Sequence, residues 1–281
     1  PAKGPPEGDH LVRALDTWPK DVEYWKYGGG GTIWDATVYD PETDLLYFGT
    51  GNGTPWNREM RDPDDGDNLY VCSIVAIDPD TGEYKWHYQV VPGDSWDYDA
   101  VSPMFTADLT IEGRKRHVLV QPSKNGFIYV LDAKTGEFIS GDAFTGVTWA
   151  LGIDENGRPI EAPGARYETE PFNVGPGAPG GHTWHPNAFS PDTGLVYIPT
   201  WENYNAMVPQ VRPANGPPPL IAFGGRYDPA TLKPHNKQAN DGWLQAWDPV
   251  ARKTVWESER GPRATSGVLA TGGNLVFMGN S

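Results

Sequence analysis

The stretch that decides the fold is AIDPDTGEYKW, residues 76–86, which joins two β-rich runs by an Asp-initiated turn. The sequence LDAKTGEF at residues 131–138 repeats this pattern, and AWDPVARKTVW at residues 246–256 repeats it in a weaker form. A related turn occurs in YDPETDLLY, residues 39–47, and in SPDTGLVY, residues 190–197. In such a turn the Asp carboxylate accepts hydrogen bonds from backbone N–H groups further along the turn, and Gly adopts the positive φ that the turn requires. The chain is therefore predicted to consist of short strands joined by tight turns.

Repeats of this kind predict an all-β fold, a β-propeller with four-stranded antiparallel blades. We expect blades at about residues 30–90, 100–140 and 184–257, and the start of another at 266–281. The Trp that closes the second strand of a repeat is expected to pack flat against a neighbouring unit. Because propellers need about four to eight blades, these units cannot close a ring. We therefore expect residues 1–281 to be part of a longer polypeptide or to be completed by other chains.

Two segments between these blades, residues 141–183 and 203–241, are rich in Gly and Pro. Loops of this length are uncommon unless they have a function, so we interpret both as functional insertions. Almost no helix is expected outside them, because an apolar period of 3.6 is hard to find elsewhere in the chain.

Charge and composition restrict the functions that this chain can have. Its 281 residues include 37 acidic and 22 basic side chains, and the net charge of −15 argues against nucleic acid or an anionic membrane as the main partner. No apolar run reaches the roughly 18 residues of a transmembrane helix. The single cysteine, Cys72, excludes an internal disulfide, a Cys-rich zinc site and a covalently attached c-type haem.

Asp97 and Asp99, in the stretch DSWDYDA, are the most informative site candidates. In an extended segment residues two apart lie about 6–7 Å from each other on one face, so these carboxylates would share a face. Trp96 and Tyr98 would lie on the opposite face. Two adjacent carboxylates resist joint ionisation unless a cation lies between them, and oxygen ligands suit hard cations such as calcium. Asn52, placed at the end of a strand, offers another such oxygen, and the alternative is a turn with exposed acids.

Two other polar stretches are given structural interpretations. The sequence RDPDDGD at residues 61–67 fails the EF-hand pattern, because Gly and Glu are missing from the sixth and twelfth positions. We interpret it as a solvated surface loop. His182 and His185 have no acidic partner nearby in the sequence, so we interpret them as turn and core residues.

Six motifs, in order over nearly the whole chain, carry a resemblance to a known family. They are GGGTIWDA at residues 29–36, LYFGTGN at 46–52, WDYD at 96–99, KNGFIYVLD at 124–132, GHTWHP at 181–186 and GVLAT at 267–271. Together they resemble the pyrroloquinoline quinone (PQQ)-dependent, or quinoprotein, alcohol dehydrogenases. The resemblance implies an eight-bladed propeller, of which this chain would form about half, with PQQ and a metal ion in the central funnel.

The resemblance implies four cofactor-binding residues. Trp34 resembles the indole on which the flat quinone stacks, and Thr32 resembles a hydroxyl that hydrogen-bonds the cofactor. Lys124 resembles the cation beside the quinone carbonyls, where it would stabilise developing negative charge. Asn203 corresponds to a cofactor-contacting Asn of the family.

The resemblance also implies the catalytic and metal-binding residues. Asp97 resembles the catalytic base that takes the alcohol proton, and it shares the metal with Asn52, which resembles an amide ligand. Calcium-type members commonly have an uncharged residue two positions after the catalytic Asp, whereas lanthanide-type members have a second Asp, as Asp99 here. An added carboxylate favours a trivalent ion, so we expect Asp99 as a third ligand. The alternative is that Asp99 is a solvated neighbour and the ion is calcium.

The resulting prediction is an enzyme, an oxidoreductase that oxidises a primary or secondary alcohol to the carbonyl, with PQQ as redox cofactor and calcium or a lanthanide as Lewis acid. Its partners would be a small alcohol and a cytochrome c or quinone that accepts electrons, and its location the periplasm. The alternative is a non-catalytic propeller of PQQ-like repeats that acts as an assembly or binding module, and a sugar-oxidising quinoprotein is a third interpretation. The enzyme requires Trp34, Asn52 and Asp97 to meet Lys124 around one cavity.

Overall fold

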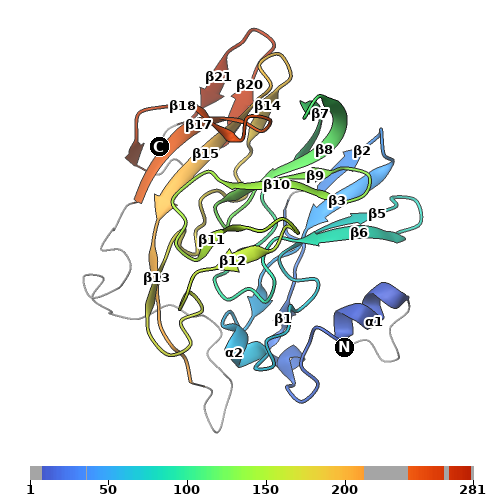
Figure 1. Cartoon of the computed structure of the whole chain (residues 1–281), viewed down its shortest axis with the longest axis vertical. Helices are drawn as coiled ribbons and strands as arrows, with labels where there is room; N and C mark the ends of the chain where they lie inside the picture. The colour runs from blue at the N-terminus through green and yellow to red at the C-terminus, as the bar shows by residue number, and fades with distance from the viewer. Residues whose placement is uncertain (1–7, 36, 212–239, 263–265, 280–281) are drawn as a thin grey trace.

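The computed structural model describes residues 8–35, 37–211, 240–262 and 266–279. Within these ranges the chain is mostly β, and most of its strands belong to three antiparallel sheets (Figure 1). The greater part of the second insertion, residues 212–239, lies outside the described residues.

The three sheets follow one another along the chain. Their strand orders are β2-β3-β5-β6, β10-β9-β8-β7 and β14-β15-β17-β18, and β19 also pairs with β17. The bounds are β2 Thr37–Asp40, β3 Leu45–Gly49, β5 Ser73–Ile77, β6 Tyr84–Gln89, β7 Phe105–Ile111, β8 Arg114–Pro122, β9 Phe127–Asp132, β10 Phe138–Ala143, β14 Ala188–Ser190, β15 Leu195–Asn203, β17 Asn240–Asp248, β18 Lys253–Glu257 and β19 Gly261–Pro262. In Figure 1 the sheets lie one after another, from blue and cyan through green to orange.

Four smaller two-stranded pairs complete the described strands. They are β1 Gly29–Gly30 with β4 Gly53–Thr54, β11 Ala150–Ile153 with β12 Pro159–Glu161, β13 Phe172–Val174 with β16 Asn205–Met207, and β20 Val268–Ala270 with β21 Val276–Met278. The first insertion, interpreted from the sequence as a long loop, therefore contains β11, β12 and β13.

Three short helical segments lie outside the insertions, where almost none was expected. They are α1 Asp9–Leu15, the 3₁₀ helix η1 Tyr24–Tyr27 and α2 Arg58–Arg61. The helix α2 is only four residues long and is capped by Asn57, whose side chain accepts a hydrogen bond from Glu59 N. Such segments span two turns or fewer, which is too short for an apolar helical period to appear in the sequence.

The predicted Asp-initiated turns are confirmed in the first two repeats. Asp78 Oδ1 accepts from the N–H groups of Asp80 and Thr81, and the turn closes at Gly82, whose φ is 73°. The turn at Asp132 has the same contacts and closes at Gly136, whose φ is 74°. The weaker repeat keeps the Asp248 contacts but places Arg252 in the left-handed region, with φ 57°. The hydrogen bonds to the Asp carboxylate are therefore present in all three turns, whereas the glycine is present in only two of them.

Alternate residues of β9 show how neighbouring sheets pack. Phe127, Tyr129 and Leu131 belong to a buried cluster shared with β5 and β6 of the first sheet. Ile128 and Val130 belong to a different cluster shared with β15 and β17 of the third sheet. Because successive side chains of a strand point to opposite faces, both faces of the second sheet are buried. This explains why β9, a central strand of that sheet, is a continuous apolar run instead of an alternating one.

Trp86 at the second strand of the first repeat packs against the turn of the next repeat, as expected. A Cβ placed on Gly136 would lie 2.6 Å from Trp86 Cε3 and 2.7 Å from Cδ2, so the indole occupies the space where a side chain would stand. Trp86 is buried. The turn glycine therefore both closes its own turn and receives the ring of the neighbouring sheet.

The helices among the described residues are all too short or too polar to cross a lipid bilayer.

Gly136→Ala should destabilise the protein more than Gly82→Ala does. Both glycines close the same type of turn with nearly the same φ, so each substitution carries a left-handed strain of about 1–2 kcal/mol. Only Gly136 faces Trp86, whereas nothing lies within 4 Å of a Cβ at Gly82. Overpacking should add about 1–3 kcal/mol at Gly136, measured as the free energy of unfolding in urea. Equal losses in the two variants would contradict the packing role of the turn.

Candidate functional site

Loops at the ends of strands bring three of the candidate residues into direct contact. Asp97 and Asp99 lie between β6 and β7, and Lys124 lies in the turn between β8 and β9. Lys124 Nζ donates to Asp97 Oδ2 at 2.9 Å and to Asp99 Oδ2 at 2.7 Å. Lys124 and Asp99 are buried and Asp97 is partly buried. The arrangement places one ammonium group between two carboxylates.

Asn52 joins this group through its backbone. The strand β3 ends at Gly49, so Asn52 lies in the connection to β4 and does not end a strand, contrary to the expectation. Its N–H donates to Asp99 Oδ1 at 2.8 Å, and its side-chain Nδ2 donates to Gly53 O at 3.0 Å. The amide nitrogen is thus turned to the backbone of its own loop, beside the carboxylate of Asp99.

Gly51 is the point where Thr32 and Trp34 approach the carboxylates. Its N–H donates to Thr32 O at 2.9 Å. A Cβ at this glycine would lie 3.0 Å from Thr32 O, 3.0 Å from Asp99 Oδ1 and 3.5 Å from Trp34 Nε1. A side chain at position 51 would therefore separate the indole from Asp99. The Trp34 side chain is 46% exposed, so it has surface available to a flat ring.

Asn203 reaches the same region through a glycine-rich loop. Its Nδ2 donates to Gly180 O at 2.7 Å, and a Cβ on Gly180 would lie 2.3 Å from Lys124 Cγ. Asn203 is buried, and its Oδ1 has no hydrogen-bond partner among the residues that the structure describes. A buried acceptor without a donor is rare in proteins, so this oxygen is an open binding position next to the loop that covers Lys124.

The segment around Asp97 is a tight loop and not the extended strand that the sequence suggested. The buried carboxylate of Asp94 accepts from the N–H groups of Trp96 and Tyr98 through Oδ1 and of Asp97 through Oδ2, at 3.1–3.2 Å. Asp97 itself has a φ of 69°. The spacing argument therefore placed Asp97 and Asp99 together for the wrong reason, because Lys124 and not strand alternation brings their oxygens to one point.

Arg61 is the principal supporting residue that the sequence did not reveal. The run 61–67 was interpreted as a solvated loop, but Arg61 and Asp62 are fully buried. Arg61 Nη2 donates to Asp94 O at 2.7 Å, and its Nε donates to Asn68 Oδ1 at 2.9 Å. A Cβ on Gly53 would lie 2.4 Å from Arg61 Cζ, so the guanidinium lies flat against that glycine. Arg61 thus connects the Asn52 loop to the Asp97 loop.

A cluster of buried aromatic side chains packs against the loops that carry Asp97, Asp99 and Lys124. Trp96 and Tyr98, which flank Asp97, are fully buried and pack against Trp149 with ring centroids 4.9 and 5.3 Å from it. Trp149 Nε1 donates to Asn125 O at 2.9 Å, which fixes the residue after Lys124. One indole therefore supports the loops that carry the carboxylates and the ammonium group.

Burial controls the titration of the charged triplet. Removal from water raises the pKa of Asp97; Lys124 opposes this shift and the neighbouring Asp99 carboxylate adds to it. Burial alone would lower the pKa of Lys124, but the attraction of Asp99 and Asp97 outweighs it, so the net pKa of Lys124 is raised. Asp97 is therefore a carboxyl group with increased proton affinity, held beside a permanently charged amine.

The residues present fit both a hard cation and a flat polar cofactor. Asn52, Asp97 and Asp99 offer only oxygen ligands, which suit calcium or a lanthanide ion. The unsatisfied Asn203 Oδ1 and the half-exposed Trp34 offer an acceptor and a stacking surface. The site therefore combines the two sets of groups that PQQ and its metal need.

A family model described as "PQQ: Glucose/ethanol/alcohol dehydrogenase, beta-propeller domain" matches residues 9–141. Quinohemoprotein alcohol dehydrogenase ADH IIB of Pseudomonas putida is 50% identical over 280 residues, which cover 99% of this chain and 40% of that protein. Quinohemoprotein alcohol dehydrogenase of Comamonas testosteroni is 44% identical over 289 residues, with the same two shares.

Solved structures give the same result. The crystal structure of the Comamonas testosteroni enzyme superposes with a TM-score of 0.87 at 42% identity, covering 98% of this chain and 42% of the other. A europium-containing methanol dehydrogenase superposes with a TM-score of 0.77 at 39% identity, covering 93% of this chain and 45% of the other. The chain belongs to the PQQ-dependent, or quinoprotein, alcohol dehydrogenase family. It spans about 40% of the length of the curated relatives that it matches.

Lys124→Met should destabilise the protein by about 3–5 kcal/mol near pH 8, because it leaves two buried carboxylates without their cation. The loss should be smaller at pH 5, since Asp97, whose pKa is already raised, then takes up a proton and relieves the repulsion. Lys134→Met, at an exposed lysine in the next turn, is the control and should change the free energy of unfolding by about 0.5 kcal/mol or less. Urea unfolding at the two pH values tests this, and a pH-independent loss would contradict the role of Lys124 as counter-ion.

Proposed function

We propose that the protein oxidises a primary or secondary alcohol to the carbonyl compound with PQQ as redox cofactor and a metal ion as Lewis acid. The observation that carries this proposal is the contact of Lys124 with both Asp97 and Asp99, next to Asn52 and the exposed indole of Trp34. These are the oxygen ligands, the cation and the flat surface that the chemistry needs. The names of the relatives support the same activity.

Each residue has a task that follows from its position. Trp34 would support one face of the cofactor, while Thr32 and Asn203 Oδ1 would hold its polar edge. Lys124 would stabilise negative charge that develops on the cofactor's oxygens. When bound, PQQ accepts the two electrons that the alcohol carbon loses.

Asp97 is the proposed catalytic base. Its carboxylate would remove the proton from the substrate hydroxyl as the carbon is oxidised, which requires only hydrogen-bond reach to that oxygen. Burial increases the proton affinity of this group, so it is a stronger base than an exposed aspartate. Lys124 holds one of its oxygens and thereby fixes the direction of the carboxylate.

Asn52, Asp97 and Asp99 are the proposed metal ligands from this chain. The second carboxylate, Asp99, adds negative charge and oxygen donors, and a trivalent ion gains more from each added charge than calcium does. We therefore propose a lanthanide ion, with calcium as the alternative. The superposition on a europium-containing methanol dehydrogenase supports this choice.

The sheets are proposed to be successive four-stranded blades of an eight-bladed propeller, of which this chain supplies about half. The blades would lie at about residues 30–90, 100–140 and 184–257, and another would begin at 266–281. Burial of both faces of the second sheet supports stacking of this kind. The rest of the proposed ring would come from segments in the part of the relatives' length that this chain does not span.

The proposed enzyme acts in the periplasm and passes electrons to a cytochrome c or a quinone. Relatives named "quinohemoprotein" and "alcohol dehydrogenase (quinone)" support these two classes of acceptor. A non-catalytic assembly module would have no use for a buried Asp97–Lys124–Asp99 triplet, and we favour the enzyme for that reason.

Asp97→Asn should lower alcohol oxidation by about 10²–10⁴-fold, because the amide keeps the shape of the carboxylate but cannot take the proton. The assay is reduction of an artificial electron acceptor by the full-length protein reconstituted with PQQ and metal. The exposed Asp192→Asn is the matched control and should retain full activity. Full activity of Asp97→Asn would exclude Asp97 as the base.

Asp99→Ala should reduce the preference for lanthanum over calcium. We expect the wild-type protein to be more active after reconstitution with lanthanum, and the variant to lose at least ten times more activity with lanthanum than with calcium. The ratio of the two activities is the measurement, because a general loss of stability would lower both. Equal activity of the wild-type protein with both ions, unchanged by the substitution, would contradict the lanthanide assignment.

A further inference from the structure

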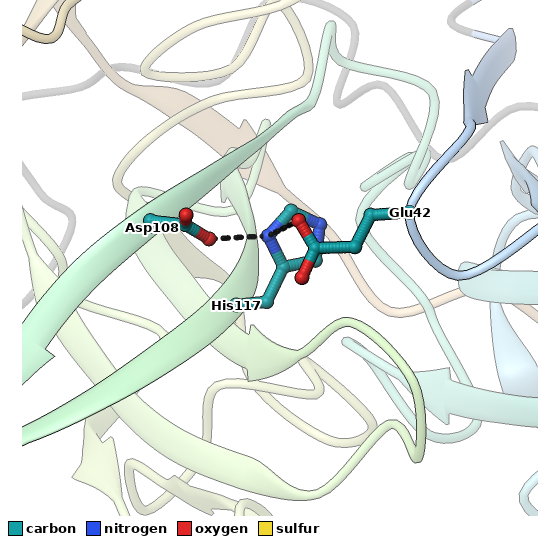
Figure 2. Close-up of side chains that lie close together, drawn as sticks. All are labelled: Glu42, Asp108 and His117. Carbon is teal, nitrogen blue, oxygen red and sulfur yellow. Dashed lines mark hydrogen bonds and ion pairs between the residues drawn. The ribbon is translucent and has the colours of Figure 1, made fainter.

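His117 lies among carboxylates at the junction of the first two sheets, in a group that includes none of the proposed active-site residues (Figure 2). It belongs to β8 and is directly opposite Asp108 of β7 in the strand register. Its Nδ1 lies 2.7 Å from Asp108 Oδ1 and 3.4 Å from Glu42 Oε2, and Glu42 follows β2 of the first sheet. Two neighbouring sheets therefore contribute to one group of ligand atoms.

The other ring nitrogen of His117 has a buried partner. Nε2 lies 3.1 Å from Asp40 Oδ2, and Asp40 is 3% exposed. Thr43 donates to the same Asp40 oxygen from its N–H and its Oγ1, at 3.1 and 2.6 Å. Asp40 Oδ2 is therefore an acceptor for three donor groups, the third being Nε2 of the imidazole when that nitrogen carries a proton.

Nδ1, the other ring nitrogen, faces Asp108 and Glu42. Burial opposes a charge on His117, but its hydrogen bonds with Asp108 and Asp40 outweigh burial and raise its pKa. When Nδ1 carries no proton, Nδ1, Asp108 Oδ1 and Glu42 Oε2 are three acceptors within 4.8 Å of one another, and they attract a cation. A proton on Nδ1 is one solution and a metal ion is the other. A histidine whose second nitrogen donates to a buried carboxylate is the usual arrangement of a metal-ligating histidine.

We propose that His117 Nδ1, Asp108 and Glu42 form a binding site for a divalent transition-metal ion of the zinc class. One imidazole nitrogen and two carboxylate oxygens form a ligand set that suits zinc. Calcium takes oxygen ligands only, so this set does not favour calcium. Asp40 is the positioning residue that orients the imidazole. The ion would connect the first sheet, through Glu42, to the second.

The distances require little movement. Tetrahedral zinc with bonds of about 2.0–2.2 Å places its ligand atoms about 3.3–3.6 Å apart. The separation of Nδ1 and Glu42 Oε2 is already 3.4 Å, Asp108 Oδ1 at 2.7 Å from Nδ1 must move outwards, and all three ligand atoms lie within 4.8 Å of one another. The side chains of Glu42 and Asp108 are 61% and 70% exposed, so both can adjust. A cavity of about 390 Å³, lined by Glu42 and His117, leaves room for a water molecule as fourth ligand.

The test is titration of the chelator-treated, full-length protein with Zn²⁺ in a calorimeter at pH 7.5. The wild-type protein should bind one more zinc ion per chain than His117→Gln does, whereas zinc bound at Asp97 and Asp99 would be common to both. Asp108→Asn and Glu42→Gln should weaken this additional binding at least tenfold. They change exposed side chains and keep the test valid if His117→Gln does not fold.

Glu168→Gln is the matched control. Glu168 belongs to a second cluster, with Glu59 and Asp65, that lacks a histidine, and its substitution should leave the additional zinc binding unchanged. Zinc should also raise the unfolding temperature of the wild-type protein but not of Asp108→Asn, because an ion that binds only the folded state stabilises it. Equal zinc stoichiometry and affinity in the wild-type protein and His117→Gln would overturn the proposal. Stability that depends on pH through His117 without zinc binding would show a protonated histidine only, and would also overturn it.

Discussion

The ammonium group of Lys124 between the carboxylates of Asp97 and Asp99 is the interaction on which the site depends. Two carboxylates in a poorly solvated loop repel each other and each has lost hydration, so the loop needs a buried cation. The loop that carries both carboxylates joins β6 of the first sheet to β7 of the second, and Lys124 lies in the turn between β8 and β9 of the second sheet, against the glycine loop at Gly180. Correct placement of the charges is therefore a result of how the first and second sheets pack.

Sequence patterns predicted the strands and turns well, because both depend on local chemistry. The Asp78 and Asp132 turns need only a carboxylate, the following N–H groups and a glycine, all within five residues. The apolar run at residues 127–131 indicated a strand, and in the structure both faces of this strand, β9, are buried. The helix α2 was missed, because four residues are too few for a period and its cap at Asn57 resembles any polar loop.

The candidate residues were found by their resemblance to a family, but their support was not. Asp94 organises the loop through three N–H groups, and Arg61 binds its backbone from a stretch that looks fully solvated in the sequence. Arg61 contacts a main-chain oxygen more than 30 residues away, and Asp94 contacts main-chain N–H groups within a turn of unusual geometry. Such contacts leave no periodic signal, since any buried polar side chain of suitable length satisfies them.

The packing of Trp86 on Gly136 makes the junction between the first two sheets directional. The first sheet supplies an aromatic ring and the second supplies a turn without a side chain, so the two halves of this contact cannot be exchanged. The next junction is built differently, because Arg252 stands at the equivalent turn position of the third sheet and forms an ion pair with Asp142 of the second. Each of these two junctions therefore has its own chemistry, which fixes the order in which the sheets stack.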